Sequence, residues 1–223
     1  DAAGCVGAAG CVIDGGGGTV ATLTALPQTG DADTALFSEQ NYGGVRGLGV
    51  DFTTGAGAEP EIQFSTKPEG VRIEFNLPQT ISEITLAHFY YDGFFSGGDE
   101  PDETAIIRAF SGAISQTQTP TRTGDTDFTV GYTGVGTPTV AAINQGGSNP
   151  YRGGLVSLTG LFGDLAGITK LEFEAGAPLN ASDTSDYSID KVVSVVPAPF
   201  GALLIGSAFL VAGALRRRGR TAA

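Results

Sequence analysis

Acidic side chains are the groups in this sequence best suited to binding chemistry. Asp99 and Asp102 lie in the stretch GGDEPDE, and Asp183, Asp186 and Asp190 form a second group further along the chain. Calcium takes about six to eight oxygen ligands, usually carboxylates and backbone carbonyls from loops. We treat these five aspartates as candidate ligands of a structural calcium ion, the one cofactor that the sequence suggests. The alternative is that they are solvated loop residues that keep the protein soluble.

Groups for nucleophilic or acid–base catalysis are scarce. His88 is the only histidine, and because it lies in a pattern typical of a strand we assign it to the sheet. The 24 carboxylates permit many glycosidase-like pairs, but no spacing selects one of them. The glycines at 15–18 lack the Lys and the strand–helix context that phosphate binding requires. The sequence therefore predicts a protein that is not an enzyme, with a jelly-roll hydrolase as an alternative.

Cys5 and Cys11 are the only cysteines, and each occupies the same position in a repeated AAGCV segment. In an oxidising compartment such a pair forms a small disulfide loop, which is our prediction. Lipidation of Cys5 is the alternative, because a Cys after small residues is similar to a lipobox. We interpret residues 1–18 as a separate Gly-rich segment in which the glycines at 15–18 form a flexible hinge.

Aromatic residues gather in the segment 89–95, where five of the seven side chains are Phe or Tyr. Only alternate rings of a strand can face the core, so some of these rings should be exposed. Exposed rings stack on sugars, dock a partner or rest at a membrane interface. Packing of the rings beneath a loop is the alternative.

Charge divides the chain into an acidic body and a basic end. The 24 acidic and 12 basic residues give a net charge of −12, and four of the basic residues are Arg216, Arg217, Arg218 and Arg220. An acidic body excludes nucleic acid as a partner, because such binding depends on clustered Lys and Arg. The chain has no Met, so we expect that a leader such as a secretory signal precedes Asp1.

The segment 195–215 contains no charged residue. A helix of that length rises roughly 31 Å, close to the ~30 Å thickness of a bilayer's hydrocarbon core. The arginines that follow place residues 216–223 in the cytoplasm by the positive-inside rule and residues 1–194 outside. The prediction is one transmembrane helix, and a buried helix of a soluble domain is the alternative.

Small residues recur along this predicted helix at a spacing of four. Ala202 and Gly206 form one pair, and Ala208 and Ala212 form another. Such pairs let a second helix approach closely in lipid, as in a subunit of a larger membrane complex. The alternative is that Gly and Ala are simply common in tails of this kind.

The end of the chain resembles a known sorting signal. Val196, Pro197, Ala198 and Pro199 precede the apolar segment and the arginine cluster. This order resembles the PEP-CTERM sorting-signal family, in the variant with an apolar residue between the two prolines. The resemblance covers residues 196–223 and implies an exosortase-type enzyme that cleaves near the proline motif. A permanent anchor that is never cleaved is the alternative.

The body of the chain, residues 19–194, shows short apolar or alternating runs between Gly, Pro, Asn and Asp. This pattern predicts a β-sandwich or jelly roll. The expected strands are 20–26, 45–53, 61–65, 71–76, 81–92, 105–110, 127–132, 139–143, 155–159, 170–174 and 187–195, with one short helical turn at 161–166. The segments 166–173 and 183–192 are similar to the last strands of jelly-roll-like exported domains that carry such signals.

These features together predict an exported, membrane-anchored β-sandwich with a structural or binding role in the cell envelope or extracellular matrix, in contact with polysaccharide. The alternative is a single-span accessory subunit of a respiratory or photosynthetic complex, whose acidic domain caps the periplasmic face. Both hypotheses place the protein in a bacterial inner membrane as a single-pass protein. Its ectodomain would be periplasmic or extracellular, and its C-terminus cytoplasmic.

Overall fold

The structure is a computed structural model of an all-β protein. It describes residues 2–27, 35–42, 45–52, 61–64, 69–90, 103–123, 128–134, 141–144, 154–163, 165–176 and 185–196. The only helical element in these ranges is the short 3₁₀ helix η1 (Ala2–Cys5). The strands are β1 (Gly10–Gly16), β2 (Thr19–Leu26), β3 (Ala35–Tyr42), β4 (Val45–Phe52), β5 (Ile62–Phe64), β6 (Gly70–Ala87), β7 (Ala105–Ser111), β8 (Ile114–Arg122), β9 (Phe128–Gly134), β10 (Ala141–Asn144), β11 (Val156–Thr159), β12 (Ile168–Ala175) and β13 (Ser185–Val195).

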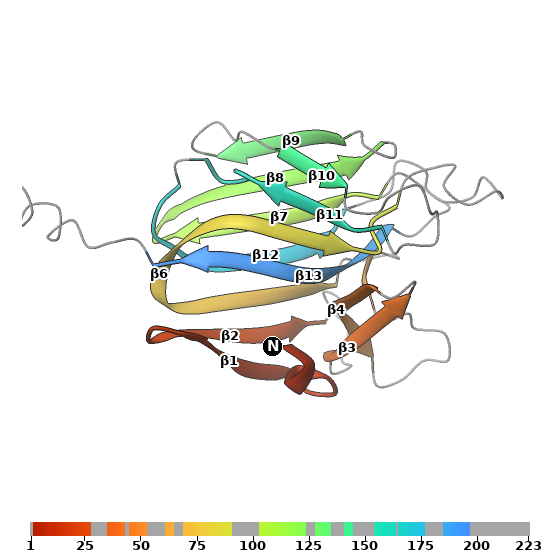
Figure 1. The fold of residues 1–223 in the computed structure, drawn as a ribbon, viewed down its shortest axis with the longest axis horizontal. Helices are drawn as coiled ribbons and strands as arrows, with labels where there is room; N and C mark the ends of the chain where they lie inside the picture. The colour runs from red at the N-terminus through yellow and green to blue at the C-terminus, as the bar shows by residue number, and fades with distance from the viewer. Residues whose placement is uncertain are drawn as a thin grey trace, which may run out of the picture.

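These strands form one open antiparallel sheet whose two halves are joined by the long strand β6 (Figure 1). The first part of β6 pairs with β2 and β12, and β12 continues the sheet to β7, β8 and β9. The second part of β6 pairs with β11 and β13, and β13 continues it to β4 and β3. We call these the β12 half and the β13 half.

The two halves share a single apolar core, as in a β-sandwich. Val71, Ile107 and Phe173 belong to it from the β12 half, and Ile84 and Leu158 belong to it from the β13 half, all fully buried. Alternate residues of each strand point to this core because side chains alternate between the faces of a strand. The all-β class predicted from the alternation is therefore confirmed, in a sandwich-like arrangement.

The change of partner within β6 occurs at its exposed Leu77–Pro78 step. Pairing with β2 ends at Phe75, pairing with β12 continues through a register shift to Gln79, and pairing with β13 begins at Thr80. Proline has no N–H to donate to a neighbouring strand, so it suits a place where one ladder ends and another begins. The sequence predicted two strands here, at 71–76 and 81–92, and the structure corrects this to one bent strand that ends at Ala87.

The N-terminal segment also differs from its prediction. Residues 10–16 form β1, which pairs with β2, and Gly16, Gly17 and Gly18 take φ values of 79°, 61° and 84° in the turn between them. Such values favour glycine, so the expected flexible hinge is instead a hairpin turn. The N–H of Gly7 donates to the carbonyl of Phe37 at 2.7 Å, so residues before β1 also bond to the sheet.

The other predicted elements agree only in part with the structure. The predicted strands at 20–26, 45–53 and 105–110 are confirmed as β2, β4 and β7, whereas β3 and β8 were not predicted. The expected helical turn at 161–166 is replaced by hydrogen-bonded turns, from Gly163 N to Gly160 O at 3.2 Å and from Leu165 N to Phe162 O at 2.9 Å.

Candidate functional site

The outer face of the β12 half carries a row of charged side chains that arises from strand alternation. In β6, Val71 and Ile73 are buried while Arg72 between them is partly exposed. In β12, Leu171 and Phe173 are buried and their neighbours point outward in the same way. We use the name charged ladder for the five outward residues that form ion pairs here: Arg72, Arg108, Lys170, Glu172 and Glu174.

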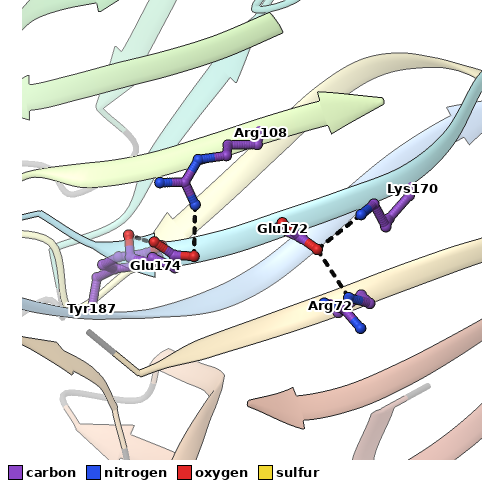
Figure 2. Close-up of polar contacts among 6 residues, drawn as sticks. All are labelled: Arg72, Arg108, Lys170, Glu172, Glu174 and Tyr187. Atoms are coloured by element: carbon purple, nitrogen blue, oxygen red, sulfur yellow. Dashed lines mark hydrogen bonds and ion pairs between the residues drawn. The ribbon is translucent and has the colours of Figure 1, made fainter. Parts of the chain in front are cut away.

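The ladder crosses three strands in register, as Figure 2 shows. Glu172 Oε1 accepts hydrogen bonds from Arg72 Nε at 3.0 Å and from Lys170 Nζ at 3.0 Å. Arg108 Nη1 lies 2.6 Å from Glu174 Oε1. Partial burial raises the pKa of Glu172, but the bonds from Lys170 and Arg72 outweigh this and hold its pKa below the ordinary value. The carboxylate is therefore ionised at neutral pH.

A buried tyrosine supports the ladder from beneath. Tyr187 is fully buried on β13, and its hydroxyl donates to the backbone carbonyl of Glu174 at 3.0 Å (Figure 2). Its ring meets Phe89 edge-on, with centroids 6.0 Å apart. Burial raises the pKa of Tyr187 well above its ordinary value, so the hydroxyl keeps its proton. A residue of the β13 half thus fixes the backbone of the ladder strand.

The ladder offers hydrogen-bonding groups on an exposed sheet surface. Arg72 and Arg108 keep 37% and 32% of their side-chain surface exposed. Three of the six basic residues in the described ranges belong to this ladder, although the chain as a whole is acidic. Lys170 Nζ also lies 3.8 Å from the centre of the Phe110 ring. Guanidinium, ammonium and carboxylate groups in such a row suit a hydroxyl-rich ligand.

An apolar cleft of about 300 Å³ opens between the two halves, on the side of β2 and β4. The first part of β6 contributes Ile73 and Phe75, and the opposite wall includes Ile189 and Val192 of β13. A shift in register between Ile189 and Lys191 brings both Asp190 and Lys191 to the cleft. The volume is at the lower end of ligand pockets, so the cleft has room for a narrow apolar group.

A second polar cluster is sealed inside the β13 half. His88 Nδ1 lies 2.6 Å from Ser188 Oγ and 3.5 Å from Glu61 Oε1, and all three residues are buried. A catalytic triad needs the serine and the carboxylate on opposite ring nitrogens, but here both contact Nδ1. Burial lowers the pKa of His88 to about 4, although a hydrogen bond to the Val45 backbone opposes the shift. The arrangement is that of a neutral structural imidazole.

The backbone at this histidine departs from the strand that the sequence predicted. β6 ends at Ala87, and His88 has a φ of 55°, the left-handed region that non-glycine residues seldom adopt. The chain therefore turns at His88, and the N–H of the next residue, Phe89, donates to the Gly154 carbonyl at 3.2 Å.

Near His88 lies a buried carboxyl group that the sequence did not indicate. Glu103 is 1% exposed, and its Oε2 accepts a hydrogen bond from the Tyr90 N–H. Burial first, and then the neighbouring carboxylates of Asp186 and Glu61, raise the pKa of Glu103 well above its ordinary value. Buried Arg122 donates to the carbonyl of Phe89. These residues are far apart in sequence, and no local pattern connects them.

The comparisons with family models, with curated proteins and with solved structures each give no match. The function must therefore be argued from the geometry of the ladder, the cleft and the buried clusters.

The candidate calcium ligands are not brought together within the described ranges. Asp99, Asp102 and Asp183 lie outside them. Asp186 hydrogen-bonds to Glu103, whereas Asp190 lies at the cleft, where burial raises its pKa although Lys191 opposes the shift. The described residues contain no group of three His, Cys, Asp or Glu side chains that could hold a metal ion.

The two cysteines form a disulfide bond, with Cα atoms 5.4 Å apart. Cys5 is 2% exposed and packs in the core, so the bond ties η1 to β1 within the domain. Of the aromatic segment, Phe89 and Tyr90 are buried, and residues 91–95 lie outside the described ranges.

Most of the C-terminal predictions also fall outside the described ranges. Val196 is described and exposed. The remaining residues are Pro197, Ala198, Pro199, Ala202, Gly206, Ala208, Ala212, Arg216, Arg217, Arg218 and Arg220, and none of them is described. Within the ranges that the structure covers, no helix is long and apolar enough to cross a bilayer.

Proposed function

We propose that this protein is an exported, non-enzymatic β-domain of the cell envelope, held in the inner membrane by a helix within residues 195–215, that binds polysaccharide along the charged ladder. In this proposal the β12 and β13 halves are the two layers of a jelly-roll-like sandwich. The observation that carries the binding role is the in-register row of ion-paired side chains on an exposed sheet face.

The ladder favours a hydroxyl-rich polymer over a compact ligand. Its residues come from three adjacent strands, so their polar groups form an extended row across the sheet. Each sugar hydroxyl donates and accepts hydrogen bonds, and the ladder supplies both donors and ionised acceptors. The ion pairs hold these side chains in place before binding, which lowers the entropy cost of ordering them.

Export is supported by the disulfide, because such bonds persist in oxidising compartments. The non-enzymatic role is supported by the sealed His88 cluster, whose serine is fully buried and shares one ring nitrogen with the carboxylate. Membrane attachment is supported by the uncharged segment that begins at Val195, the last residue of the last strand.

The binding role is tested by affinity electrophoresis of the full chain in mild detergent, through gels that contain alginate or dextran. The variant Arg72→Gln/Arg108→Gln should weaken retention about tenfold, because two charged hydrogen-bond donors are lost. Arg46→Gln is the matched control, since Arg46 forms an exposed ion pair with Glu39 at 3.3 Å on β3–β4, away from the ladder. Equal loss in both variants, or no retention by either polymer, would contradict the proposal.

The location is tested by fractionating native cells, measuring the intact mass of the protein and identifying proteins that co-purify with it. A membrane-bound species that retains Arg216–Arg220 supports the anchor, and a species that ends near Pro197 supports cleavage as in a sorted envelope protein. Stoichiometric membrane partners would instead favour the accessory-subunit alternative. Recovery with reduced cysteines in the soluble cytoplasmic fraction would overturn export.

A further inference from the structure

The end of the domain at which β13 finishes gathers several segments that are distant in sequence. Val195 pairs with Thr80, two residues after Pro78 in the bend of β6. A Cβ on Gly167 would lie 3.9 Å from Pro78 and 3.4 Å from Ser111, and Ser111 pairs with Ile114 in the β7–β8 turn. Figure 1 shows the β6 bend and the end of β13 together at the left of the view. We call this the exit end.

The exit end concentrates exposed apolar surface. Four of the seven large apolar side chains that are exposed in the described ranges lie here: Leu77 at 37%, Ile114 at 47%, Val195 at 53% and Val196 at 46%. The other three, Val6, Val12 and Tyr132, lie in η1–β1 and β9. Apolar residues that gather on one surface, rather than lying singly, are typical of an interaction site.

The described residues at the same end carry little charge. Among its described residues, in the ranges 14–19, 76–81, 111–115, 160–163, 165–167 and 194–196, the only charged side chain is Asp14. Asp14 Oδ1 already accepts a hydrogen bond from Gly16 N at 2.8 Å. The buried acids Glu61, Glu69 and Glu103 lie toward the opposite end, beside the first residues of β5, β6 and β7. The described part of the exit end therefore presents little charge to repel an anionic surface.

We propose that the exit end rests on the surface of the lipid bilayer, so that the strands stand upright on the membrane. This inference depends on the proposed anchoring by residues 195–215. Only four peptide units separate Val196 from Phe200, the first residue after the two prolines of the segment 195–215, and a fully extended chain covers about 14 Å over that length. Prolines suit the entrance of a helix and not its interior, so we expect the helical part of the segment to begin near Phe200. The domain cannot then lie far from the hydrocarbon core, and the end nearest to it is the one at which the exposed apolar side chains gather.

The test uses the full chain, which has no tryptophan, so that a single introduced Trp is the only reporter of its kind. Leu77→Trp and Ile114→Trp report on the exit end. Tyr132→Trp is the matched control, because Tyr132 is 48% exposed and Ile114 is 47% exposed. Tyr132 lies on β9 opposite Gln118, which is four residues along β8 from Ile114 and so further from the exit end. Thr123→Trp, just past the other end of β8, is a second control.

Each variant is reconstituted into vesicles of phosphatidylethanolamine and phosphatidylglycerol, part of whose lipid is replaced by phosphatidylcholine brominated high on its acyl chain. Bromine quenches only nearby tryptophans, so we expect at least a twofold loss of fluorescence at positions 77 and 114. The two controls should lose little. Equal quenching at all four positions, or none at 77 and 114 in a chain that floats with the vesicles, would overturn the inference.

The outcomes separate this inference from the proposed anchoring. A chain that does not float with the vesicles overturns the anchor and the inference together. A chain that floats without quenching at the exit end leaves the anchor standing and overturns only the orientation. A blue shift at position 77 without quenching would indicate that a second protein copy covers this end, which also contradicts contact with lipid.

Discussion

His88 and Glu103 are two ionisable residues whose burial favours the neutral form of each side chain. His88 is neutral because burial lowers its pKa to about 4. Glu103 retains its proton because burial and nearby carboxylates raise its pKa well above the ordinary value. Between about pH 4.5 and 6.5 the folded protein therefore carries one of the two protons, and the unfolded chain also carries one, on the histidine instead. The contributions of these two groups to the pH dependence of stability cancel in that range.

Replacing His88 by Gln should reveal the contribution of His88 to the pH dependence of stability. The unfolded histidine takes up a proton below about pH 6.5 whereas the folded one does not until about pH 4, so its contribution to stability is lost as the pH falls through that window. Between pH 7.5 and pH 4, wild type should therefore lose at most about 3 kcal/mol of unfolding free energy relative to His88→Gln. Urea denaturation at both pH values measures it, and parallel pH curves would contradict a buried neutral imidazole.

Replacing Glu103 by Gln should reveal the contribution of Glu103 to the pH dependence of stability. The amide stays neutral at every pH and can keep both hydrogen bonds, from the Tyr90 N–H and to Asp186. The folded wild type must hold a proton that its unfolded chain releases above about pH 4.5, so wild type loses stability as the pH rises. Glu103→Gln should match wild type at pH 4 and have a higher melting temperature at pH 7.5. A variant that gains nothing at pH 7.5 would mean that the Glu103 carboxyl is ionised in the fold.

At the scale of single elements, the β1–β2 hairpin depends on links made by side chains as well as by strand pairing. Asn76 of β6 accepts a hydrogen bond from Val20 N at 2.7 Å and donates one to the Gly18 carbonyl at 2.9 Å, which fixes the glycine turn against the sheet. The Cys5–Cys11 bond fixes the other end of β1. The hairpin is therefore held at both ends.

Removing the disulfide should loosen one of these ends. The bond closes a loop with a sequence separation of six, for which the chain-entropy model gives a stabilisation of about 2 kcal/mol. Cys5→Ser/Cys11→Ser should lose about that much in denaturant unfolding and show faster amide exchange in β1. Val12→Ser is the control, because Val12 is exposed on the same strand and contributes little to the core. An unchanged exchange rate in β1 would show that the bond does not hold this strand.

The strands that sequence reasoning identified are those with apolar alternation. Residues 71–75 and 187–192 alternate clearly, and both lie in strands of the sheet. β8 was missed because its inward positions include Gln116 and Gln118, which are fully buried, so its sequence reads as polar. The charged ladder could have been inferred from the alternation in β6 and β12, but the order of strands that brings Arg108 beside them is a property of the whole sheet.

At the scale of the whole molecule, the halves are not independent because one strand and one core belong to both. Phe173 of β12 is fully buried in the cluster that also contains Leu86 and Leu158 of the β13 half. A substitution that disrupts the core in one half should therefore destabilise the other half as well.

Phe173→Ala should lower the free energy of unfolding by roughly 3–5 kcal/mol, the range for removing a buried phenylalanine. Hydrogen exchange should lose protection equally in β12 and in β11, which lie in different halves. Tyr132→Ala, at an exposed position, is the control and should cost under about 0.5 kcal/mol. Loss of protection confined to β12 and its neighbours would show that the halves unfold separately.

The position of β13 also determines how the protein resists a pulling force. β13 lies between β4 and β6 and is the last described strand before the proposed anchor. In the proposed arrangement, tension between a bound polymer and the membrane would enter the domain through Val195 and Val196. That tension acts along the strand, parallel to its axis. The hydrogen bonds between β13 and β6, from Ser188 opposite Ala87 to Val195 opposite Thr80, are then loaded in shear and must break together. A domain tethered through this strand is built to bear mechanical load.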